Sequence, residues 1–181
     1  MSGAPEFSRR VPLARIGTEP HRQRISASEE ERAALARRFD LVSLDRLEAA
    51  VELIVNGERT ILLRADFEAA FAQRCIVTLD PIAGVLAERF ALLYGPPEAE
   101  ETAASLAGED VAFEPLVGDA IDIGEAVAQE FSLALPPFPR SPDAPPDATI
   151  ETAVGSGPDS AAASHPFAGL LRLVERDGGE R

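Results

Sequence analysis

Few side chains in this sequence could do bond-making chemistry. The one thiol, Cys75, has no histidine near it in sequence to act as a base, and a lone cysteine is more often a small buried hydrophobic residue. His21 and His165 lie far apart, and turn or helix-capping roles account for Asp119 and Asp122. The motifs of nucleotide-binding, serine-hydrolase and zinc-protease sites are absent. We therefore predict a protein that is not an enzyme, holds no metal and uses no cofactor.

Arginine side chains offer a second kind of chemistry, the binding of phosphate. A guanidinium group can hold a phosphate through two parallel hydrogen bonds. The arginines near the N-terminus that could line such an edge are Arg9, Arg10, Arg22 and Arg24. An equally simple interpretation is that they carry ordinary solubilising charge at outward strand positions.

The overall charge limits how nucleic acid could be bound. The chain has a net charge of −14, and residues 95–181 hold four arginines against seventeen acids. Because such a surface repels nucleic acid as a whole, any contact with RNA must be local. One cysteine, no apolar run of about 18 residues and no apolar leader near the start predict a cytoplasmic protein that uses no membrane.

The N-terminal part is expected to form two short strands and one helix. The stretches FSRRVPL (7–13) and HRQRISA (21–27) are the candidate strands, around a turn at GTEP. The helix lies within 26–40, with Ser28 as its N-cap and Glu31 at the spacing of a capping box.

The clearest β pattern follows in residues 47–94. Apolar residues alternate with polar ones over 47–55, the Asn56–Gly57 pair predicts a hairpin with positive φ at both positions, and the alternation resumes over 61–71. The stretch 67–75 alone could be helical, but the longer alternation favours a strand. A third strand over 82–94 completes an antiparallel meander with one buried face.

An amphipathic helix then supplies a cover for that face. Asp122 is its expected N-cap, with Glu125 at capping-box spacing, and Pro136 must end it. Before it, VAFEPL (111–116) is predicted as an edge strand because of its proline. The fold class predicted is α+β, an antiparallel β-meander sheet covered by one or two helices.

Composition changes sharply after the helix. We predict one domain over 1–139, a disordered linker over 140–164 that is rich in proline, serine and alanine, and a short docking segment over 165–177. Apolar residues recur at helical spacing in that last segment, so we expect it to dock either on its own domain or on a partner.

Three motifs in this order resemble one family, the large ribosomal RNA subunit accumulation proteins known as YceD. AQRCIVTLDP (72–81) is similar to the family's cysteine-containing knuckle between two strands. DIGEAVAQEFSLALPPFPRSP (122–142) resembles its helix followed by prolines, and HPFAGLLRL (165–173) resembles its ending. The likeness covers about residues 7–175.

The resemblance implies candidate contacts as well as a departure from the family. Arg74 is a candidate for phosphate binding, although a salt bridge to Asp80 or Glu68 explains it equally well. The docking residues implied are Pro166, Phe167 and Leu170. Members often have further cysteines that suggest a metal site, but here Ala72 replaces one and none follows the prolines, so we expect packing and hydrogen bonds to hold the knuckle.

The function that the resemblance implies is non-catalytic support of 23S ribosomal RNA accumulation, and so of large ribosomal subunits, in bacteria. The expected partners are precursor rRNA or ribosomal proteins, with neither DNA nor a membrane involved. A second hypothesis is an adaptor whose acidic C-terminal half binds basic ribosomal proteins without touching RNA. The sequence does not indicate the oligomeric state.

Overall fold

The computed structural model describes residues 5–57, 60–99 and 111–145 of the 181-residue chain. The chain divides into two units, Met1–Ala144 and Pro145–Arg181, and the fold below is that of the first. The predicted docking segment, with Pro166, Phe167 and Leu170, lies outside the described residues, as does most of the predicted linker. Both therefore stay predictions.

The secondary structure follows the predicted order. The N-terminal part contains β1 (Arg10–Pro12), the 3-10 helix η1 (Leu13–Arg15), β2 (His21–Ser26) and α1 (Glu29–Arg38). There follow β3 (Ser43–Val55), β4 (Ile61–Arg74), β5 (Pro81–Gly95), η2 (Pro97–Ala99), β6 (Ala112–Pro115), β7 (Ala120–Asp122) and α3 (Ile123–Ala134). Within the described ranges, no helix is long and apolar enough to cross a membrane.

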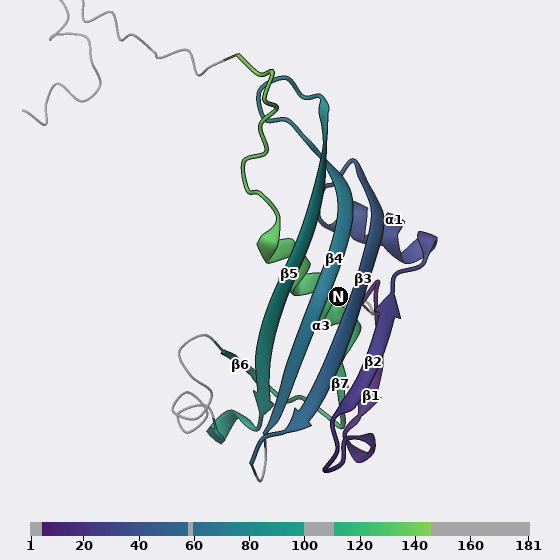
Figure 1. Cartoon of the computed structure of the whole chain (residues 1–181), viewed down its shortest axis with the longest axis vertical. Coiled ribbons are helices and arrows are strands. Elements are labelled where there is room, and N and C mark those ends of the chain that lie inside the picture. Colours follow the sequence, from purple (N-terminus) through teal and green to yellow (C-terminus); the bar gives the residue numbers. More distant parts are fainter. Residues whose placement is uncertain (1–4, 58–59, 100–110, 146–181) are drawn as a thin grey trace, which may run out of the picture. The chain divides into compact units, whose positions relative to one another are not determined.

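Five of the strands form one sheet in the order β2-β3-β4-β5-β6 (Figure 1). The pairs from β2 to β5 are antiparallel, and β6 runs parallel to the end of β5. β1 and β7 make a separate antiparallel pair. The α+β class and the antiparallel meander are confirmed, and the strand expected over 111–116 does lie at an edge.

The hairpin between β3 and β4 is confirmed, but its turn differs from the prediction. Val55 lies opposite Ile61, so the connection covers residues 56–60. Gly57 has a positive φ of 82°, whereas Asn56 does not. The Asn56 N–H donates to the carbonyl of Thr60 at 2.8 Å and so continues the strand pairing. The expectation of positive φ at both positions was therefore wrong, because Asn56 belongs to the ladder.

Helix α1 begins as its sequence predicts. The Ser28 side chain accepts a hydrogen bond from the Glu31 N–H, and the Glu31 carboxylate accepts one from the Ser28 N–H. The capping box is therefore confirmed, and it satisfies two N–H groups that the helix itself leaves free.

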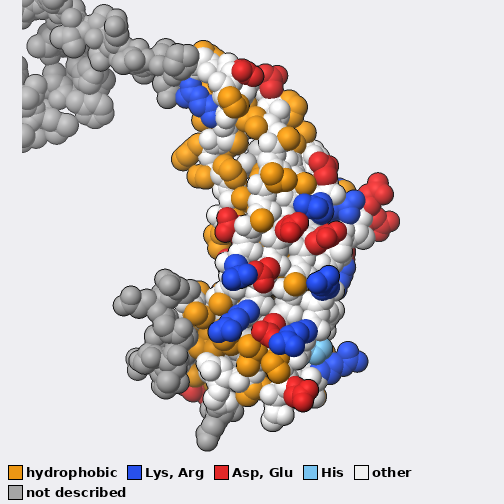
Figure 2. Space-filling model, viewed as in Figure 1, with side chains coloured by type: hydrophobic (Ala, Val, Ile, Leu, Met, Phe, Trp, Pro, Cys, Tyr) orange, Lys and Arg blue, Asp and Glu red, His pale blue; other side chains and the backbone are white. Residues whose placement is uncertain are grey.

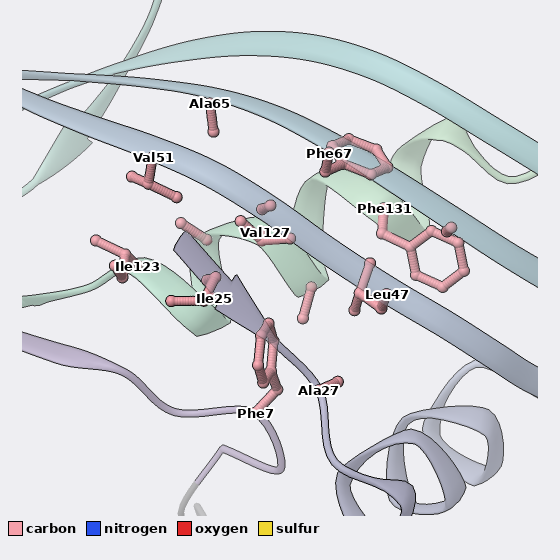
Figure 3. Close-up of a cluster of buried hydrophobic side chains, with 14 of the residues drawn as sticks. Phe7, Ile25, Ala27, Leu47, Val51, Ala65, Phe67, Ile123, Val127 and Phe131 are labelled. Carbon is pink, nitrogen blue, oxygen red and sulfur yellow. The ribbon is translucent and has the colours of Figure 1, made fainter. Parts of the chain in front are cut away.

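Helix α3 covers one face of the sheet and closes the core (Figure 3). Val127 and Phe131 of the helix are fully buried and point toward the side chains of β3 and β4. The Phe131 ring lies edge-on to Phe67 and Phe71, with ring centres 6.4 and 5.6 Å apart. The alternation over 61–71 puts these partners on one side of β4, and hydrophobic burial then holds the helix there.

Both ends of α3 are set by identifiable residues. Asp122 is the N-cap and accepts hydrogen bonds from the N–H groups of Gly124 and Glu125. The Glu125 carboxylate bonds to Arg38 of α1 at 2.7 and 2.9 Å, so the expected capping box does not close. The helix ends at Ala134, and extended backbone at Leu135 precedes the prolines, as predicted.

Candidate nucleic-acid interface

The face of the sheet that α3 leaves uncovered carries most of the charged side chains of the strands. Alternation along β4 buries the odd-numbered residues from Leu63 to Phe71 and exposes Arg64, Asp66 and Glu68. Figure 2 shows basic and acidic side chains together across the middle of this outer face. The same alternation that builds the core therefore also builds a charged surface on the other side.

Strand register brings four arginines from three strands together on the outer face. One row across the sheet holds Arg22, Glu52, Arg64 and Ala91, and the next holds Arg24, Ala50, Asp66 and Arg89. Neighbouring strands lie about 4.8 Å apart, and adjacent rows about 6.7 Å apart. The four guanidinium-bearing positions thus fall within about 16 Å of one another.

These arginines line a shallow hollow of about 880 Å³. Its charged lining residues are Arg22, Arg24, Arg64 and Arg89 with Glu52 and Asp66. Four positive and two negative groups give a formal charge of +2, on a chain whose net charge is −14. The next row along the face holds Glu48 and Glu68 and no arginine.

Two of the four arginines have carboxylate partners, and two do not. Arg22 pairs with Glu52 at 2.7 Å, and Arg89 pairs with Asp66 at 2.6 Å. Among the described residues, no ion pair or hydrogen bond involves the side chains of Arg24 or Arg64. Exposed ion pairs contribute only about 0–1 kcal/mol, so even the paired guanidinium groups can exchange a carboxylate for a phosphate at little cost.

The outer face offers charge but no surface for base stacking. Small side chains stand at Ala50, next to Arg24, and at Ala91, next to Arg64. Phe90 lines the hollow, but it pairs with Ala65 and its ring contacts Phe67 on the helix side of the sheet. In the described part of the chain, no aromatic residue occupies an outward position of β2–β5. Because RNA-binding sheets read bases by stacking on aromatic rings, this face is suited to phosphates instead.

Arg9 and Arg10, predicted as phosphate contacts, lie away from this face. Arg9 makes two hydrogen bonds to Glu31 at 2.6 and 2.9 Å, and its side chain is 30% exposed. The Arg9 hydrogen bonds lower the pKa of Glu31 below its ordinary value. Arg10 lies on β1 and pairs with Asp119 at 3.4 Å. The structure thus gives Arg9 a structural contact, and RNA binding by either residue stays a prediction.

Arg74, the remaining predicted arginine, lies at the opposite end of β4. Ten residues separate it from Arg64, which is about 33 Å along a strand. Within the described residues it pairs with neither Asp80 nor Glu68, and Glu68 pairs instead with Arg46. The structure therefore does not bring Arg74 together with Arg22 and Arg24.

The knuckle beside Arg74 is held by hydrogen bonds to a buried sulfur. The Sγ of Cys75 accepts from the N–H groups of Val77, Thr78 and Ser141, each at 3.4 Å. The Cys75 N–H donates to the Asp80 carbonyl at 2.8 Å. These donors, the Ser141 N–H foremost, outweigh burial and lower the pKa of the Cys75 thiol to about 6. In the part of the chain described, no three His, Cys, Asp or Glu side chains converge.

Sequence reasoning found Arg22 and Arg24 but missed Arg64 and Arg89 as members of the site. Both missed residues stand at outward positions of strands that the alternation itself indicates. What the sequence does not give is the register that sets β2, β4 and β5 so that these positions face the same hollow.

A comparison with models of known protein families identifies the family of this chain. The family model described as large ribosomal RNA subunit accumulation protein YceD matches residues 63–174, more than half of the chain. The chain therefore belongs to the YceD family, as its motifs suggest. Searches of curated proteins and of solved structures gave no match. The matched range includes Arg64 and Arg89, whereas Arg22 and Arg24 precede it.

Proposed function

We propose that this protein supports 23S ribosomal RNA accumulation in the bacterial cytoplasm by holding precursor rRNA on the outer face of its sheet. The family is named for large ribosomal RNA subunit accumulation. The observation that carries the proposal is the hollow lined by four arginines, a positive site on an acidic chain. No catalytic step is part of the proposal.

The physical basis is the contrast between the local charge and the overall charge. Phosphates are drawn to Arg22, Arg24, Arg64 and Arg89, while the remaining acidic surface repels RNA. Binding then occurs in one orientation, and a single-stranded or irregular segment of RNA can lie across the two rows. Without stacking rings, recognition depends on backbone shape more than on base sequence.

The test is equilibrium binding of fluorescent 23S rRNA fragments to the full chain over a range of salt concentrations. Arg24→Ala combined with Arg64→Ala removes two guanidinium groups that have no partner among the described residues, and we expect affinity to fall by about tenfold or more and the salt slope by about 2. Arg37→Ala, at an exposed position of α1, is the matched control and should leave both unchanged.

Two results would contradict the proposal. One is equal loss of affinity in the double variant and in the control, which would make the charge effect non-specific. The other is tight binding to a basic ribosomal protein with no measurable RNA affinity, which would favour the acidic adaptor. Arg74→Ala in the same assay tests whether that residue belongs to the interface.

A further inference from the structure

The outer edge of β5 is open along most of its length. β6 pairs only with Leu92–Gly95, at the end of the strand. Figure 1 shows β6 beside one end of β5, with no labelled strand along the rest of that edge. In the described part of the chain, residues 82–91 therefore have a neighbouring strand on one side only, over about 33 Å.

The backbone groups exposed along this edge can be assigned. The Gly95 carbonyl accepts a hydrogen bond from the Leu116 N–H at 2.7 Å, so the backbone N–H and C=O groups of Gly95 point away from β4. The register between β4 and β5 has no shift, and the backbone N–H and C=O groups of alternate residues in a strand point toward the same neighbouring strand. The residues whose N–H and C=O groups face the open edge are thus Ala83, Val85, Ala87, Arg89 and Ala91. None of these groups bonds to another described residue.

The first part of this edge, residues 82–87, lacks the features that usually prevent strand addition. The opposite edge strand, β2, carries Arg22 and Arg24, and β6 is four residues long and ends in Pro115. In contrast, residues 82–87 of β5 contain neither a charge nor a proline, and the Val85 side chain is 75% exposed. A long apolar edge without such protection is a template for another strand.

Carboxylates lie on the helix side of β5, both within the open edge and at its end. Glu88 points to that side within the open edge, whereas Glu114 of β6 lies opposite Tyr94, at the end of β5 that β6 covers. Burial, with the negative charge of Glu114, raises the pKa of Glu130 on α3. Among the described residues, none of these three carboxylates has an ion-pair partner. The chain's net charge of −14 attracts a basic segment to this edge, whereas a second copy of this acidic chain is repelled.

We propose that the open edge of β5, residues 82–91, binds an extended basic segment of a partner protein as an added strand. Main-chain hydrogen bonds to the five outward residues hold the segment, and its basic side chains are attracted by Glu88 and by the negative charge of the chain. This site goes beyond the proposed RNA function, because it uses the main-chain groups of the sheet's rim, although Arg89 and Ala91 also line the arginine hollow.

The test uses a labelled ten-residue peptide of alternating valine and arginine, with fluorescence anisotropy on the full chain. Two control peptides keep its length: one replaces arginine with glutamate, and the other is N-methylated at alternate residues and cannot pair. We expect Ala87→Pro and the N-methylated peptide to weaken binding at least about tenfold, because main-chain hydrogen bonds are lost. The glutamate peptide keeps those bonds but should also bind at least about tenfold more weakly, because the acidic chain repels it. Ala87→Ser, which retains the N–H, should bind as the unaltered chain does.

Several outcomes would overturn the proposal. Equal binding of the N-methylated peptide would show attraction by charge alone, and this comparison needs no variant to fold. Failure of the unaltered chain to bind the arginine peptide would also overturn the proposal. Dimers in sedimentation that Ala87→Pro dissolves would mean that a second copy occupies the edge. RNA affinity should be the same in Ala87→Pro and Ala87→Ser, which separates this test from that of the arginine hollow.

Discussion

The two faces of the five-stranded sheet use the same strands for opposite purposes. On the helix side, Leu63, Phe67 and Phe71 of β4 are buried against α3. On the outer side, Arg64 and Asp66 of the same strand are exposed. One alternating sequence thus provides a core and a charged surface, and a shift of register by one residue would exchange them.

The arginines also differ from one another in what surrounds their side chains. Arg9 and Arg38 each make two hydrogen bonds to one carboxylate of another element, and their side chains are 30% and 31% exposed. Arg24 and Arg64 are exposed on the sheet. Surroundings, more than residue type, decide which arginines stabilise the fold and which are available to a ligand.

The largest expected effect comes from the buried side of the sheet. Phe131→Ala removes a fully buried ring that contacts rings from β4, and we expect it to lower the free energy of unfolding by about 3–5 kcal/mol. Phe138, 77% exposed, is the matched control, and Phe138→Ala should change stability by less than about 0.5 kcal/mol. Urea denaturation measures both; equal losses would mean that α3 does not close the core.

A smaller effect should separate the two kinds of arginine. Arg9→Ala removes the two hydrogen bonds that Arg9 donates to the Glu31 carboxylate, so we expect about 2 kcal/mol of destabilisation. Arg24→Ala, without a partner among the described residues, should leave stability unchanged and weaken RNA binding instead. Urea denaturation and RNA titration of both variants test this difference. Destabilisation by Arg24→Ala, with weaker RNA binding by Arg9→Ala, would contradict it.

A third prediction concerns the pH dependence of stability at the knuckle. The folded pKa of Cys75, about 6, lies below its ordinary value of 9.0. Between these values the unfolded chain holds more protons, so the thiol's contribution is complete above pH 9 and is lost as the pH falls through 6. Subtracting the stability profile of Cys75→Ser should reveal a rise from pH 6 to 9; parallel profiles would show that the thiol titrates normally.

Local patterns in the sequence predicted the elements well. The alternation over 61–71, the capping box at Ser28 and the stop before Pro136 depend on residues close in sequence, and all three are present. The parallel pairing of β6 and the contact of Glu125 with Arg38 were not predicted. Both join segments far apart in sequence, and no local pattern encodes such pairings.

The candidate site was only half predictable for the same reason. An arginine at an outward position can be recognised from its own strand, as Arg22 and Arg24 were. Recognising that Arg64 and Arg89 share their hollow requires the registers of three strand pairs at once. Arg9 stands in a similar local sequence, but its partner Glu31 is 22 residues away.

Ultraviolet crosslinking in cells, with the RNA sequenced and the crosslinked peptides identified from one sample, tests the central claim most directly. We expect 23S precursor RNA crosslinked to peptides that contain Arg22 and Arg24, Arg64 or Arg89. Recovery of ribosomal proteins alone, or of RNA joined only to peptides outside the outer face of the sheet, would contradict it.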